Sequence, residues 1–91
     1  MRDTILLQSE LGRALERRRL EAGHSIQSLA RAAGKSRAVI YRLERGEASE
    51  VSSLLAVAAA LGLALKLEKA ELPTLGETAG FFDEEDDDGT P

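Results

Sequence analysis

The chain of 91 residues is long enough for one small domain with tails and too short for two ordinary hydrophobic cores. It has no Cys and a single His, which excludes a disulfide framework, a thiolate zinc site and a cluster of His ligands. The longest apolar stretch, residues 54–65, is too short to cross a bilayer, and residues 5–7 are too short for the core of a signal peptide. We therefore expect a soluble, cytoplasmic protein that carries no metal or cofactor.

The formal net charge of −4 is distributed unevenly along the sequence. Residues 1–69 contain all 12 Lys and Arg residues and 8 of the 16 acids, whereas residues 70–91 contain the other 8 acids and no base. Positive charge is densest in residues 11–46, where 9 bases accompany 3 acids. A basic body of this kind suits a nucleic-acid partner, and the acidic C-terminal segment is a separate part of the chain.

The first two helices are predicted from apolar periodicity and from the residues that begin and end helices. The first starts after the N-cap Ser9 and ends before Gly23, and the second starts after the N-cap Ser25 and ends before Gly34. The inward residues of the first helix are Leu11, Ala14, Leu15 and Ala22. Those of the second helix, which recur along one helical face, are Ile26, Leu29, Ala30 and Ala33.

A third helix follows the tight connection at Gly34 and Lys35 and runs from Ser36 to Arg45, with Ile40 and Leu43 inward. Two short helices joined this tightly form a helix-turn-helix unit, whose second helix enters the major groove of DNA. A fourth helix starts at Ser49 and ends before Gly62. Its predicted inward residues are Val51, Leu54, Leu55, Ala58 and Leu61.

Beyond the fourth helix the period of the apolar residues changes from helical to alternating. Leu63, Leu65 and Leu67 share one face, which predicts a β-strand over residues 63–68. A lone strand leaves its backbone donors and acceptors without partners, and only residues 4–7 offer another candidate strand in the chain. We expect the strand to pair antiparallel with that of a second copy, burying the three leucines in a two-fold homodimer.

The predicted fold class is all-α, with four helices, one short C-terminal strand that pairs across a dimer, and an acidic tail. The predicted segments are an N-terminal extension at 1–9, a helix-turn-helix domain at 10–62, a dimerisation strand at 63–72 and the tail at 73–91. The tail cannot bury enough apolar surface to order itself, so we expect disorder there. Its two aromatics, Phe81 and Phe82, either anchor the tail in a partner's groove or belong to an ordinary solvated tail, which is the commoner case.

Three runs of the sequence fall in one register: residues 23–30 (GHSIQSLA), 33–37 (AGKSR) and 40–46 (IYRLERG). Together they resemble the Xre-type helix-turn-helix family of phage repressors and Cro proteins, over roughly residues 10–62. The strand at 63–68 stands where such domains usually have a fifth helix, and in this respect the chain resembles the HipB-like antitoxin branch. The resemblance implies a DNA-binding repressor, and its narrower form implies a HipA-like kinase as toxin partner.

Helical spacing places the basic side chains of the third helix opposite its inward residues. Arg37 and Arg42 are the candidates for reading bases, because a planar guanidinium donates two hydrogen bonds to O6 and N7 of guanine. Ala38 or Val39 is expected to contact a thymine methyl, and Tyr41 lies on the same outward face. An Arg-rich helix face is often only solvated, and it is the register of the family that favours DNA binding here.

The resemblance implies further roles for polar residues. The family pattern gives phosphate contacts to Gln27, Ser36 and Arg45, and it pairs Arg19 with Glu44 in an ion pair that braces the first helix against the third. Some positions differ from the family: Ile26 stands where a DNA-contacting Gln is usual, Lys35 replaces an apolar turn residue, and His24 replaces a Leu. For His24 we expect a hydrogen-bonded boundary role, since no second ligand completes a site.

Catalysis is not expected, because the sequence has no phosphate-binding glycine loop, nucleophile elbow or His-paired nucleophile, and the acids at 83–88 lack the spacing of a calcium loop. The predicted function is a homodimeric, sequence-specific repressor of transcription acting on a palindromic double-stranded DNA operator. Two alternatives remain for its setting. The protein is either the antitoxin and autorepressor of a toxin–antitoxin operon, or a stand-alone or phage-type regulator without a toxin partner.

Overall fold

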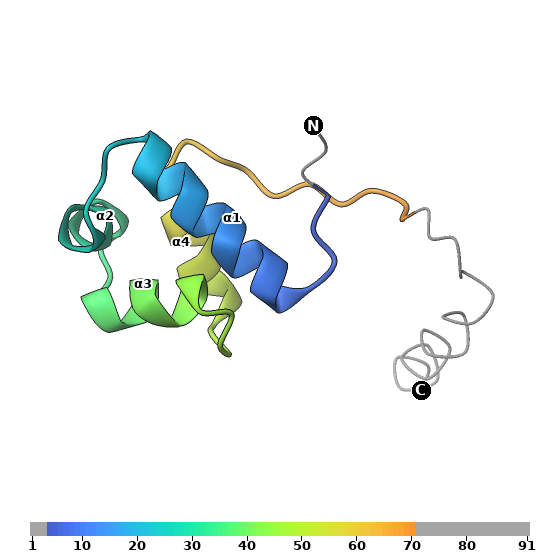
Figure 1. Ribbon diagram of the computed structural model, residues 1–91, viewed down its shortest axis with the longest axis horizontal. Coiled ribbons are helices and arrows are strands. Elements are labelled where there is room, and N and C mark those ends of the chain that lie inside the picture. The colour runs from blue at the N-terminus through green and yellow to red at the C-terminus, as the bar shows by residue number, and fades with distance from the viewer. Residues whose placement is uncertain (1–3, 71–91) are drawn as a thin grey trace.

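The computed structural model describes residues 4–70, and within them the chain forms four α-helices. Their bounds are Gln8–Glu21 for α1, Ile26–Ala33 for α2, Arg37–Glu44 for α3 and Val51–Ala60 for α4. α1 packs along α3, and α2 packs against both α3 and α4 (Figure 1). The prediction of an all-α domain with four helices is confirmed. The predicted tail, with Phe81 and Phe82, lies outside the described residues.

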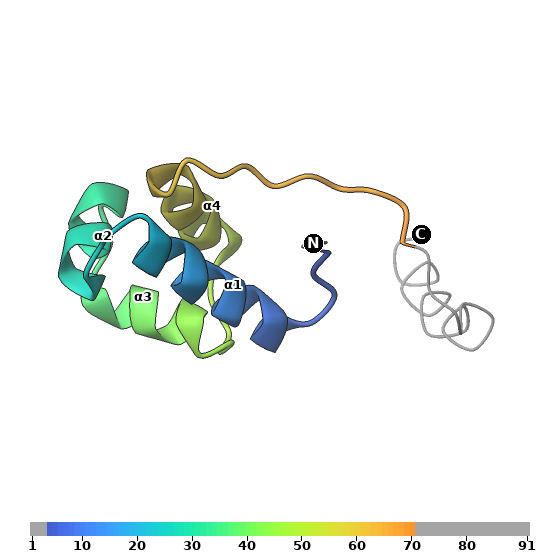
Figure 2. The same ribbon diagram turned by 45° about the horizontal axis from the view of Figure 1, so that its top comes forward.

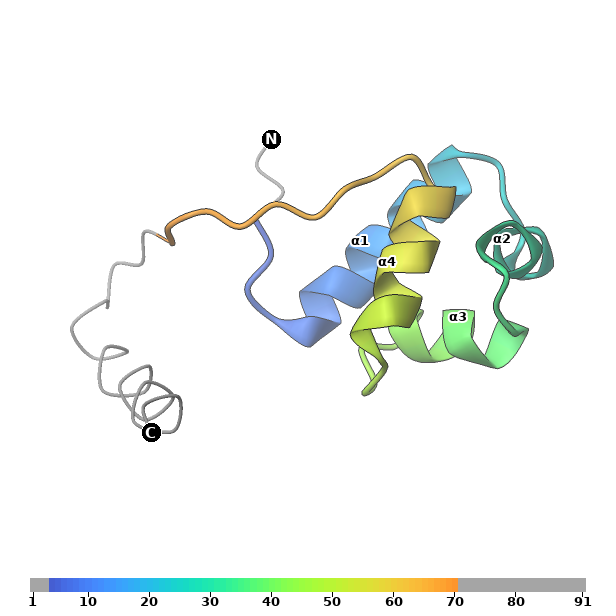
Figure 3. The same cartoon turned by 180° about the vertical axis from the view of Figure 1, so that it is seen from behind.

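The hydrophobic core lies where the four helices meet. Leu29 of α2, Ile40 of α3 and Val57 of α4 are fully enclosed, with no more than 1% of each residue exposed. Leu15 of α1, Ala30 of α2 and Leu43 of α3 complete the cluster, and α4 closes it from behind (Figure 3). Each side chain of this size contributes ~1.5–3 kcal/mol by leaving water. Packing of this core fixes the position of α3 in the domain.

Local hydrogen bonds set the joint between α2 and α3. Ser25 Oγ accepts a hydrogen bond from the Ser28 N–H at 3.0 Å, and Ser36 Oγ accepts one from the Val39 N–H at 3.3 Å. Both serines are therefore the N-caps that the sequence predicts. α2 ends at Gly34, whose φ of 69° is a left-handed conformation that a side chain disfavours. Two caps and one glycine thus define the helix-turn-helix joint.

The start of α1 differs from the prediction. Ser9 is not the N-cap, because α1 begins at Gln8 and Leu7 holds the N-cap position. Glu10 Oε1 accepts hydrogen bonds from the N–H groups of Leu6 and Leu7 at 2.9 and 3.0 Å, so a carboxylate inside the first turn satisfies two backbone donors where the helix begins. The hydrogen bond from Leu6, and to a smaller extent that from Leu7, lowers the pKa of Glu10. At the other end of the helix Ala22, predicted inward, is an exposed C-cap.

α4 also differs from the prediction in its start and in its inward face. Its N-cap is Glu50 rather than Ser49. Val51 and Leu55, predicted inward, are 66% and 46% exposed, whereas Ser53, Val57 and Ala58 are buried. Residues 51–60 contain no charged side chain, so the contrast in polarity that marks the inward face of a helix is missing from the sequence.

Residues 63–70 leave α4 as an extended segment that runs away from the helices (Figures 1 and 2). We call this segment the leucine arm. Leu63 is half-buried where the arm begins, whereas Leu65 and Leu67 are 52% and 98% exposed. Within residues 4–70 the arm forms no β-ladder, with residues 4–7 or with any other segment. The predicted partner strand belongs to a second copy of the chain, so pairing across a dimer stays a prediction.

Candidate nucleic-acid interface

α3 has one face in the core and the other in solvent. Ile40 is 0% and Leu43 is 5% exposed, so both point inward as predicted. We call the opposite face the recognition face; its exposed residues are Arg37, Ala38, Tyr41, Arg42 and Arg45. Val39, the other candidate for a thymine methyl contact, is half-buried and packs against the core. The recognition face therefore combines three guanidinium groups, one phenol ring and one methyl group.

Glu44, the acid of α3, is turned away from this face by an ion pair with α1. Arg19 Nε lies 2.6 Å from Glu44 Oε2, and Arg19 Nη2 lies 3.2 Å from Glu44 Oε1. Both side chains are about 90% buried, at 10% and 9% exposure. The hydrogen bond to Glu44 raises the pKa of Arg19 above its ordinary value. Because the negative charge of Glu44 is matched inside the domain, the recognition face is left with positive charge.

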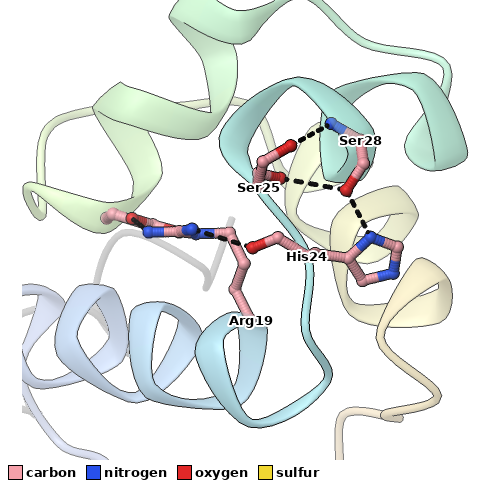
Figure 4. Close-up of polar contacts among 5 residues, drawn as sticks. Arg19, His24, Ser25 and Ser28 are labelled. Atoms are coloured by element: carbon pink, nitrogen blue, oxygen red, sulfur yellow. Dashed lines mark hydrogen bonds and ion pairs between the residues drawn. The ribbon is translucent and has the colours of Figure 1, made fainter.

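The same arginine also reaches the start of α2 (Figure 4). Arg19 Nη1 donates a hydrogen bond to the carbonyl of His24 at 3.0 Å. Ser28 Oγ lies 2.7 Å from His24 Nδ1 and donates to the carbonyl of Ser25 at 3.3 Å. The hydroxyl of Ser28 therefore lies within hydrogen-bond distance of both the His24 ring and the Ser25 carbonyl. Half-buried His24 thus links α1 to the N-terminus of α2.

Arg45 is restrained at the end of the recognition face. Its Nε lies 3.1 Å from Glu47 Oε2, and its guanidinium carbon lies 5.7 Å from the centre of the Tyr41 ring. The backbone carbonyl of Glu47 accepts a hydrogen bond from Gln8 Nε2 at 2.9 Å, which ties this loop to the start of α1. The Arg45 and Glu47 side chains are 62% and 50% exposed, so the pair is weak and the guanidinium stays accessible to solvent.

The packing of α1 on α3 depends on a glycine that the sequence analysis did not single out. A Cβ added to Gly12 would lie 2.5 Å from the Glu44 carbonyl oxygen and 2.7 Å from that of Leu43. The two helix backbones therefore touch where a side chain would hold them apart. A glycine in the interior of a predicted helix is the signal that marks such a contact in the sequence. No comparable local signal marks the contact between Gln8 and Glu47, which are 39 residues apart.

The remaining candidates for phosphate contacts lie at the first turns of α2 and α3. Gln27 is exposed, whereas its neighbour Ile26 is half-buried and packs against the core. Of these two residues, Gln27 is the one that is both exposed and polar. Ser36 is exposed and accepts its capping bond through oxygen, which leaves the hydroxyl hydrogen for donation to a phosphate.

Residues 4–70 hold no group of three or more His, Cys, Asp or Glu side chains that suits a metal ion. No helix in this part of the chain is long and apolar enough to cross a membrane.

No curated protein matches the sequence. Residues 15–67, more than half of the chain, match the family model HTH_3, described as helix-turn-helix, from within α1 into the leucine arm. The chain therefore belongs to the helix-turn-helix family of DNA-binding transcriptional regulators, a family that is generally not enzymatic.

Proposed function

We propose that this regulator is a homodimeric repressor that binds a palindromic operator, with α3 of each copy in the major groove of one half-site. The main observation in support is the recognition face. Arg37 and Arg42 are exposed there, while the charge of Glu44 is neutralised by Arg19 inside the domain. In this proposal both arginines read guanines, at ~1–3 kcal/mol of discrimination for each bidentate pair. Ala38 or Val39 contacts a thymine methyl, and Tyr41 lies beside them. The proposed phosphate contacts come from Gln27, Ser36 and Arg45.

The leucine arm supports the dimer. Leu67 is 98% exposed, and the arm finds no partner strand within residues 4–70. Pairing with the arm of a second copy satisfies the backbone hydrogen bonds of both segments and buries the leucines. A two-fold dimer of this kind sets two recognition helices about one helical turn of DNA apart, ~34–36 Å.

The experiment that tests DNA binding is fluorescence anisotropy of the full-length protein on the duplex upstream of its own gene, as a function of salt. Binding through several phosphates releases counterions, so the affinity should fall by ~10³-fold or more between 50 mM and 200 mM salt. Arg42→Ala should weaken binding, whereas Arg31→Ala, which removes an exposed arginine of α2 that we assign no DNA contact, should bind almost as the wild type does. An affinity that does not change with salt would overturn the proposal.

Two arginines of the recognition face should respond differently to truncation. Arg37→Ala should relax discrimination at one base pair of the operator, with a loss of ~1–3 kcal/mol on the preferred base and little on other bases. Arg45→Ala should weaken all sequences to a similar degree and reduce the salt dependence, because phosphates carry no sequence information. Competition assays with operators substituted one base pair at a time distinguish the two. Equal loss of discrimination in both variants would contradict the assignment.

A second candidate role is that of an antitoxin that represses its own operon. It is favoured by the extended arm, which follows α4 where a fifth helix is usual and which matches the HipB-like resemblance. A HipA-like kinase is the toxin partner that this resemblance implies. Growth of cells that express the adjacent gene, with and without this protein, tests the role. Rescue from growth arrest supports an antitoxin, and an adjacent gene without toxicity favours the stand-alone regulator.

A further inference from the structure

The recognition face is a solvent-exposed surface whose charged residues are all arginines. Arg37 and Arg42 are exposed, and the carboxylate of α3 that would oppose them is buried against Arg19. Arg45 at the edge is the one residue of this face for which an ion pair with an acid, Glu47, is seen. An anionic chain segment is therefore the kind of occupant that this face fits in the absence of DNA.

The same chain carries such a segment in its sequence. Residues 83–88 are six consecutive acids, and residues 71–91 contain no Lys or Arg. Twelve residues, 71–82, separate the acidic run from the end of the leucine arm. Fully extended, they span up to ~40 Å, whereas α1, the longest helix, is only ~21 Å long. The extended connection is thus about twice as long as the longest helix, so its length does not prevent the acidic run from folding back onto the domain.

We propose that residues 83–88 dock on the recognition face of their own chain and compete there with DNA phosphates. Carboxylates offer guanidinium groups the same charge sign and paired acceptor oxygens that phosphates offer. The attraction of each exposed pair is small, but the covalent connection holds the acidic run at an effective concentration of order mM. The tail then occupies the face for part of the time and is displaced by a duplex with more phosphates.

Charge complementarity favours α3 over the other basic parts of the domain. α1 carries four arginines together with Glu10, Glu16 and Glu21, so its local charge is mixed. On the leucine arm Glu68 lies between Lys66 and Lys69. Among the helices of residues 4–70, only α3 combines several exposed arginines with a carboxylate that is neutralised in the interior. Docking should therefore be local to residues 36–45 rather than spread over the basic body.

Paramagnetic relaxation in the full-length protein tests the docking without DNA. The chain has no Cys, so Thr90→Cys gives a single site for a nitroxide label beside the acidic run. At low salt the label should broaden the amide signals of residues 36–45 more than those of α1. The effect should disappear at ~1 M salt, where charges are screened within ~3 Å. Broadening that is absent, or equal over all helices, would overturn the proposal.

Two further samples locate the contact. Arg37→Ala combined with Arg42→Ala should remove the broadening at residues 36–45, whereas Arg31→Ala should leave it unchanged. A mixture of isotope-labelled protein without nitroxide and unlabelled protein with nitroxide reports contacts between copies. Broadening in that mixture that accounts for the whole effect seen in the fully labelled sample would overturn docking within one chain. None of these readouts needs DNA, so they stay informative even where the proposed operator binding fails.

Competition is measured by the anisotropy of the full-length protein on the upstream duplex. The variant in which Asp83, Glu84, Glu85, Asp86, Asp87 and Asp88 are replaced by their amides should bind about two- to tenfold more tightly at low salt. The matched control replaces Glu71 and Glu77 by Gln. It removes a third as many negative charges, and its gain in affinity should be much smaller than a third of the gain of the six-residue variant. Addition of duplex should also abolish the nitroxide broadening of residues 36–45. Unchanged affinity of the six-residue variant, or broadening that persists with saturating duplex, would contradict competition.

Discussion

Glu44 is the residue of α3 on which the charge of the recognition face depends. Glu44→Ala leaves the Arg19 guanidinium buried without its carboxylate, so we expect a loss of ~3–5 kcal/mol in the free energy of unfolding. Glu47→Ala is the control, because it removes one partner of an exposed ion pair and should cost ~1 kcal/mol or less. Chemical denaturation of both variants measures the difference. Equal losses would mean that the buried pair does not stabilise the domain.

Glu10 gives the domain a defined dependence on pH. Its pKa is lowered in the folded state, so its contribution to stability is present at pH above the ordinary value of 4.5 and is lost as the pH falls through the lowered pKa. We expect Glu10→Gln to be less stable than the wild type at pH 7 and to match it in strong acid. Urea denaturation over a pH series checks this, with Glu16→Gln as control. A stability difference that is the same at all pH values would exclude capping by the carboxylate.

Local chemistry predicts some site residues and not others. Ile40 and Leu43 follow from helical spacing, and Ser36 follows from its capping preference. The contact of Arg19 with Glu44, which spans 25 residues, was implied by a family resemblance and not by spacing. The restraint of Arg45 by Tyr41 and Glu47 depends on the path of the loop after α3, which no local pattern specifies.

At the scale of elements, the contact between α1 and α3 makes Gly12 a sensitive position. Alanine is the better helix former by ~1 kcal/mol, so Gly12→Ala should stabilise an isolated helix. In the domain the added Cβ meets backbone oxygens of Leu43 and Glu44, and the helices must separate. We expect a net loss of ~1–3 kcal/mol, as for other overpacked contacts.

Thermal unfolding measures this loss, with Glu16→Ala on the exposed side of α1 as a near-neutral control. A Gly12→Ala variant that is more stable than the wild type would show that the two helices move apart at no cost.

The number and order of the helices could be predicted because each has a clear start or end signal in the sequence. Gly34 and the serine caps at Ser25 and Ser36 act through hydrogen bonds within a few residues. The orientation of α4 could not be predicted, because its ten residues are all apolar or small. Burial of Ser53 rather than Leu55 is decided by the shape of the surface that α2 and α3 offer, which is a tertiary property.

At the scale of the whole molecule, the leucine arm should control the oligomeric state. Leu65→Lys places a charge on the face that we expect to pair across the dimer, so the variant should sediment as a monomer at micromolar concentration and bind the operator more weakly. Ala64→Lys, on the opposite face of the arm, is the matched control and should remain dimeric. A monomeric wild type, or a dimeric Leu65→Lys variant, would contradict arm pairing.

α1 is joined to the recognition helix and its following loop at three points along its length. Gln8 donates a hydrogen bond to the loop at one end, and Gly12 packs directly against the backbone of α3 in the middle. Arg19 forms an ion pair with Glu44 at the other end. These contacts restrain α3, so in the proposed complex we expect α3 not to tilt on its own to follow a bent or unevenly spaced operator. Adjustment to such a site must come from the DNA or from the joint between domain and arm. In the proposed dimer, tolerance for half-site spacing should therefore depend on residues 61–63, which join the domain to the leucine arm.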